Sequence, residues 1–158
     1  MKNYERMIKL VTAFFGTRTD PDQISVTDEE RERLEQLHPA TFSEVANDDG
    51  PIVWLLIFPT TKALMNLFLE EKLTERELLE QTQPGDNFEA VYLCSAYVLP
   101  EFRKQGLTHK LTLDAIKSMQ KDHTIKALFY WPFSEEGKRL AQTVAAELAL
   151  PLLERNSD

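Results

Sequence analysis

The chain has 158 residues, of which 42% are apolar, so it can bury one core without metals or disulfides. Its formal charge of -8 repels phosphate backbones and argues against nucleic acid as a partner. Cys94 is the only cysteine, which excludes an intrachain disulfide or a cysteine-based metal cluster. The N-terminus mixes charges into its apolar positions, and no apolar run approaches the ~20 residues of a membrane helix. We therefore expect one domain over residues 1–158, cytoplasmic, without a metal and without a membrane partner.

The first third of the sequence predicts helices followed by a strand. Apolar residues at helical spacing predict an amphipathic helix that ends near Phe15, and TRTDPDQ then reads as a loop. Thr27 followed three residues later by Glu30 is a capping-box pattern for a short second helix. The turn formers NDDG lead into the dense apolar run PIVWLLIF, which predicts a central strand over 52–58. Residues 1–50 are thus expected to form a helical N-terminal part.

The remaining sequence alternates helices and strands. Two short helices are expected within residues 59–87, the second starting at a Thr74–Glu77 capping box. FEAVYLCSAYV predicts a long buried strand with its body at Val91–Val98. A helix to about residue 120, a strand at IKALFYW, a helix from near Ser134 and a short edge strand at PLLER follow. This order predicts an α/β (α+β) fold around one sheet, with a core over about 51–152.

The stretch YVLPEFRKQGLTHKL carries the clearest binding pattern. A buried strand, a tight turn and a helix beginning at about Lys104 leave first-turn N–H groups without intrahelical partners, and the helix dipole favours an anion there. Gly106 lets a phosphate approach the main chain, and Arg103 and Lys104 add positive charge to an acidic protein. The spacing alone is equally compatible with a glycine that only eases the turn and with cations that are merely solvated.

The same stretch resembles a known family signature. It matches V-x-P-x-x-[RQ]-x-x-G-x-[GA], the coenzyme A motif of the GNAT superfamily of acyl-CoA N-acyltransferases. Of the compared residues Val98, Pro100, Arg103, Gly106, Thr108 and Leu111, five of six fit. The resemblance implies a GNAT-like fold with a central mixed sheet flanked by helices. It also implies acetyl-CoA or a related acyl-CoA as co-substrate and an amine as acceptor. The alternative is a catalytically inactive module that binds or senses acyl-CoA.

The resemblance also implies roles for individual residues. The pyrophosphate would bind the backbone amides of the turn, and the pantetheine arm would pair with Tyr97 and Val98 at the end of the strand. Ser134 stands nearest the asparagine that the family often carries after its fifth strand. The residues assigned to the pyrophosphate are Arg103, Lys104, Gln105, Gly106, Leu107 and Thr108. The acceptor, whether a small amine, an antibiotic, a peptide N-terminus or a protein lysine, stays open, and exposed helix faces would suit a homodimer.

Several positions depart from the family pattern and leave the catalytic residues open. Thr108 stands where the family has glycine or alanine, and the last helix lacks the family's thiolate-protonating tyrosine. Tyr92 occupies the strand position where some relatives carry a glutamate, so Glu89, three residues earlier, is the candidate base. Its simpler interpretation is a solvated charge at a strand entrance. Tyr130 is the candidate acid, and its simpler interpretation is an aromatic core residue with a wet hydroxyl.

Cys94 and the histidines are not expected to act chemically. A lone cysteine in an apolar strand is usually inert, and no histidine lies near it in sequence. Strand alternation places Ser95 and Tyr97 on the face opposite Cys94, unless a bulge mixes the faces. The three histidines do not have metal-ligand spacing.

Overall fold

The computed structural model describes residues 2–16, 28–132 and 134–155, and within these ranges five strands form one sheet. The sheet order is β1-β2-β3-β4-β5. The first three strands pair antiparallel, and β3, β4 and β5 pair parallel. Their bounds are β1 Phe42–Asn47, β2 Gly50–Thr60, β3 Ala90–Val98, β4 Ala127–Tyr130 and β5 Leu152–Glu154. The fold is therefore α+β with a mixed sheet, as the element order predicts.

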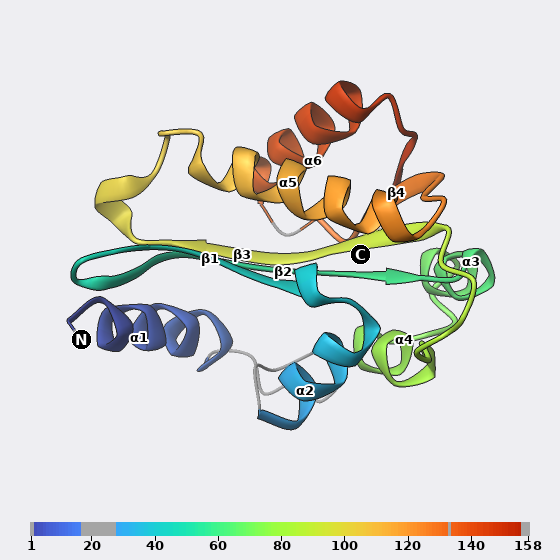
Figure 1. Cartoon of the computed structure of the whole chain (residues 1–158), viewed down its shortest axis with the longest axis horizontal. Helices are drawn as coiled ribbons and strands as arrows, with labels where there is room; N and C mark the ends of the chain where they lie inside the picture. Colours follow the sequence, from blue (N-terminus) through green and yellow to red (C-terminus); the bar gives the residue numbers. More distant parts are fainter. Residues whose placement is uncertain (1, 17–27, 133, 156–158) are drawn as a thin grey trace.

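Helices cover both faces of this sheet. Figure 1 shows α5 and α6 above it, α1 and α2 below it, and α3 and α4 beside the end where β2 finishes. The helix bounds are α1 Lys2–Gly16, α2 Asp28–Leu37, α3 Lys62–Leu69, α4 Glu75–Gln81, α5 Leu107–Asp122 and α6 Glu135–Leu148. The helices predicted from apolar spacing are confirmed, including the pair in the 59–87 segment. TRTDPDQ and Thr27, the first residue of one predicted capping box, lie outside the described residues.

The core divides between the two faces because successive strand residues point to opposite sides. Phe58, Tyr92 and Phe129 pack with residues of α2, α3 and α4 on one side. Val91 and Leu128 pack against α5 and α6 on the other. The β3 strand is thus buried on both faces over its first half, which is why its sequence is almost free of charge there.

Strand β1 was not predicted, and the N-terminal part is therefore not purely helical. Its sequence FSEVAN lacks a dense apolar run, because its residues are half-buried or exposed. The NDDG turn joins β1 to β2 as a hairpin, in which Asn47 pairs with Gly50. Gly50 has φ 115°, a conformation that favours glycine. The predicted central strand, β2, is internal because it pairs with β1 on one side and β3 on the other.

A bulge interrupts β3 at Cys94. Leu93 pairs with Ile57 and Ser95 pairs with Leu56, so Cys94 is an extra residue in the ladder. Tyr92 and Tyr97 consequently lie on the same face, because their β2 partners, Phe58 and Trp54, are an even number of residues apart. Cys94 packs against the same cluster as Tyr92. The expectation that Tyr97 lies opposite Cys94 is therefore wrong, and the inserted residue is the reason.

Candidate functional site

The loop between β3 and α5 is built from a short turn and two left-handed residues. A 3-10 turn spans Pro100–Phe102, and α5 begins only at Leu107, about three residues later than predicted. Lys104 and Gly106 have φ 64° and 75°. Glycine suits position 106 because left-handed φ is costly for other residues. A Cβ built there would meet no atom within 4 Å, so the space beside the main chain is open.

The start of α5 has no side-chain cap. Gly106 is the N-cap residue and makes no side-chain hydrogen bond. The first intrahelical bond runs from the Lys110 N–H to the Gly106 carbonyl, over 3.1 Å. The N–H groups of residues 107–109 precede that bond and carry the positive end of the helix dipole. This helix start can accept an anion.

Polar residues of the loop precede this helix start or lie in its first turn. Arg103 is exposed, and its Nε donates to the Val98 carbonyl over 3.3 Å, which places its guanidinium where the strand meets the turn. Lys104 is also exposed. Gln105 Nε2 donates to the Glu101 carbonyl over 3.2 Å and braces the turn. The half-buried Thr108 lies in the first turn of α5, and its carbonyl accepts the Thr112 hydroxyl over 2.7 Å.

The edge of β3 that leads into the loop lacks a strand partner. Pairing with β4 ends at Leu93 and Tyr130, although β3 continues to Val98. Among the described residues, no strand pairs with positions 94–98 on that side. Tyr97 is buried at 8% exposure and packs with Trp54 and with Met7 of α1. The free edge can therefore hydrogen-bond an extended, amide-bearing ligand whose charged end reaches the α5 start.

An ion pair joins this loop to the N-terminal helix. Arg6 Nη2 of α1 lies 2.6 Å from Glu101 Oε1. The hydrogen bond from Arg6 lowers the pKa of Glu101 to about 2. The pair is 95 residues apart in sequence, and sequence reasoning missed it because no local pattern links α1 to the loop.

Glu89 does not lie near the loop. It immediately precedes β3, and its carboxylate is 3.3 Å from Lys126 Nζ. The nine residues of β3 separate it from the turn, a span of about 30 Å at ~3.3 Å per residue. The structure thus brings Glu89 together with Lys126 and not with the residues expected to bind the cofactor.

Tyr130 and Ser134 lie at the carboxyl end of β4. The Tyr130 hydroxyl donates to Glu154 Oε2 over 2.9 Å. The pKa of Tyr130 is raised to about 12, mainly by burial and secondly by the adjacent Glu154 carboxylate. Its hydroxyl therefore keeps its proton at neutral pH. Ser134 is the N-cap of α6, and its Oγ accepts the Gly137 N–H over 3.0 Å. Tyr130 is level with Leu93, where β3 and β4 part.

A buried polar cluster that the sequence did not reveal lies beside the β3 bulge. Glu75 of α4 is 4% exposed, and its carboxylate accepts the Tyr92 hydroxyl over 2.5 Å. Burial and then the Glu75 charge raise the pKa values of Tyr92 and Cys94, so the Cys94 thiol stays protonated. The Thr74–Glu77 capping box is confirmed and starts α4 next to Glu75, but a cap pattern carries no information about burial.

Arg155, which follows β5, contacts residues next to this cluster. Its guanidinium lies 4.5 Å from the Phe68 ring centre and 4.6 Å from that of Trp131. Its Nη1 donates to the Leu73 carbonyl over 2.8 Å. Arg155 therefore holds the α3–α4 segment against the end of β4, close to Glu75.

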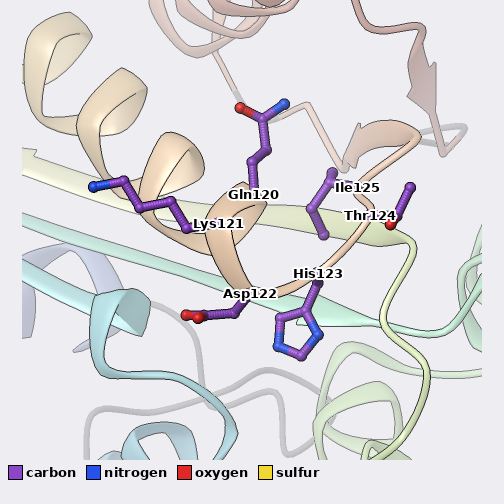
Figure 2. A pocket seen from close by; sticks show the side chains of 6 residues that line it. All are labelled: Gln120, Lys121, Asp122, His123, Thr124 and Ile125. Carbon is purple, nitrogen blue, oxygen red and sulfur yellow. The ribbon is translucent and has the colours of Figure 1, made fainter.

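A cavity of about 380 Å³ lies at the other end of α5. Figure 2 shows the side chains that line it, from Gln120, Lys121, Asp122, His123, Thr124 and Ile125. Beside it the buried His38 accepts the Ala40 N–H at Nδ1 and meets Asp122 Oδ2 at 2.7 Å through Nε2. The 16 residues of α5, about 24 Å at ~1.5 Å per residue, separate this cavity from Gly106. It is therefore distinct from the loop site.

No family model matches the chain, and no curated protein matches it either. In the described part of the chain no group of three or more His, Cys, Asp or Glu side chains could hold a metal ion. No helix in that part is long and apolar enough to cross a membrane.

Proposed function

We propose that this chain is a GNAT-like N-acyltransferase that transfers an acetyl group from acetyl-CoA, or a related acyl group, to an amine. One observation carries the proposal: the unpaired β3 edge at positions 94–98 leads directly into the uncapped start of α5. The edge suits the amides of a pantetheine arm, and the helix start suits a pyrophosphate. Arg103 and Lys104 add positive charge beside that start.

The reaction makes simple demands on the protein. The amine nitrogen bonds to the thioester carbon, the carbon–sulfur bond breaks, and one proton passes from nitrogen to the departing thiolate. Tyr130 lies where β3 and β4 part and holds its proton, so its hydroxyl remains our candidate donor. Glu89 would need the acceptor to approach from the far end of β3, whereas the Glu75 carboxylate accepts the Tyr92 hydroxyl beside the bulge.

Ligand binding is tested first by thermal unfolding with acetyl-CoA, coenzyme A and adenosine. A ligand at about 100 times its dissociation constant adds ~2.7 kcal/mol of stability, enough to raise Tm by several degrees. We expect both coenzymes to raise Tm and adenosine not to. No rise at millimolar coenzyme would refute the proposal.

A second candidate is an acyl-CoA binding module without catalysis. It is favoured by the absence of tyrosine from the α6 sequence and by the hydrogen bond that occupies the Tyr130 hydroxyl. Release of free thiol from acetyl-CoA, measured with a panel of small amines, peptides and lysine-bearing proteins, separates the two. Turnover with any acceptor supports the enzyme, and tight coenzyme binding without turnover across the panel supports the module.

A further inference from the structure

The anion site proposed above contains a carboxylate of its own. Glu101 lies in the turn between β3 and α5, two residues before Arg103. A bare carboxylate there would repel a pyrophosphate. For an assumed separation of roughly 8 Å in a medium of high dielectric, Coulomb's law gives a weakening of binding by a factor of about five for one such charge beside a doubly charged ligand. The loop therefore needs a means of offsetting Glu101.

Arg6 supplies that means from another part of the fold. Its guanidinium lies 2.6 Å from the Glu101 carboxylate, with 40% and 50% of the two side chains exposed. Arg6 Nη1 also donates to Asn3 Oδ1 over 3.3 Å, and Asn3 Nδ2 donates to Asn47 Oδ1 of the β1–β2 hairpin over 3.0 Å. The guanidinium is thus held toward the loop by Asn3 of its own helix, and Asn3 is in turn anchored to the hairpin.

We propose that Arg6 is a positioning residue for the coenzyme: it neutralises Glu101 and holds its carboxylate away from the anion site at the start of α5. This inference rests on the proposed function, because it concerns the same site. Exposed ion pairs contribute little to folding, so the main effect of this pair is on the charge that a phosphate ligand meets. Helix α1 thereby becomes part of the coenzyme site without a direct contact to the coenzyme.

The two partners of the pair have opposite expected effects, which a purely structural contact would not have. Arg6→Met leaves Glu101 uncompensated and should weaken coenzyme A binding about fivefold at low salt. Glu101→Gln removes the repulsion and should bind coenzyme A as well as the unmodified protein, or more tightly. The double variant should regain the unmodified affinity. Added salt should shrink the Arg6→Met effect by screening.

The experiment is calorimetric titration of the full chain with coenzyme A and with inorganic pyrophosphate, at low and high salt. Lys9→Met is the matched control, since it removes an exposed cation from the same helix that is not paired with Glu101. Equal losses from Arg6→Met and Glu101→Gln, or no loss from Arg6→Met, would overturn the inference while leaving the proposed function standing. If the unmodified protein binds neither probe, both proposals fall together.

Discussion

Gly106 and Gly85 offer a matched pair for testing the loop. Both have positive φ, 75° and 90°, and an added Cβ at either would meet no atom within 4 Å. Alanine at either position should therefore cost only the backbone penalty, about 1–2 kcal/mol, without a steric clash. For a domain of this size that lowers Tm by roughly 2–8 °C. The two variants should be destabilised alike, as measured by thermal unfolding without ligand.

Glutamate at the same two positions separates stability from binding. Gly106→Glu places bulk and negative charge beside the open main chain at the start of α5, where the coenzyme phosphates are proposed to bind. Gly85→Glu carries the same backbone penalty in the turn before β3. We expect saturating coenzyme A to raise the Tm of Gly85→Glu by several degrees, as in the unmodified protein, and to leave that of Gly106→Glu unchanged.

An unaltered coenzyme affinity in Gly106→Glu would refute the site. Loss of binding in both glutamate variants would show that strain alone disturbs the protein, and the argument from the loop would then fail as well. The Gly106→Ala variant adds a further check, because a small side chain in open space should weaken binding less than glutamate does.

Three further predictions concern stability. Tyr92→Phe removes the hydroxyl that Glu75 accepts in a buried site, and urea unfolding should show a loss of about 1.5–3 kcal/mol. Thr74→Ala removes the cap of α4 and should lower the free energy of unfolding by about 1 kcal/mol in the same assay. An unchanged free energy of unfolding would mean that the cap does not stabilise the fold. The folded pKa of Glu101 is about 2 against an ordinary 4.5, so its contribution to stability, which is small because the ion pair is exposed, is complete above pH 4.5 and disappears as pH falls toward 2. Urea midpoints between pH 2 and 6 should therefore fall less in Glu101→Gln, and identical pH profiles would contradict this.

Local patterns were sufficient for most of the fold. Dense apolar runs predicted β2, β3 and β4, and apolar residues at helical spacing predicted the helices, because burial of one face imposes those periods. Strand β1 was not predicted, because its residues face solvent on one side and are only partly covered on the other. It is held in place by its hairpin with β2, which a search for apolar runs does not detect.

The site was predictable only where its residues are neighbours in sequence. Gly106, Arg103 and Lys104 form a contiguous loop whose geometry follows from a strand, a turn and a helix. Arg6 reaches the loop after β3 from α1, and Glu75 reaches Tyr92, near the other end of β3, from α4. Nothing in the spacing of their own helices indicates either contact. Long-range polar contacts of this kind depend on the tertiary arrangement of the elements.

The free edge of β3 is itself an argument for a ligand. An unpaired strand edge exposes hydrogen-bonding groups that can recruit another chain, and proteins usually cover such edges or interrupt them with charge. Here β4 spans only four residues while β3 spans nine, so no strand among the described residues pairs with β3 on that side between the Cys94 bulge and the loop. Arg103 Nε donates to the last carbonyl of β3, at Val98. An extended ligand that pairs with this edge would satisfy the remaining groups, which gives the short β4 and the bulge a functional explanation that packing alone does not provide.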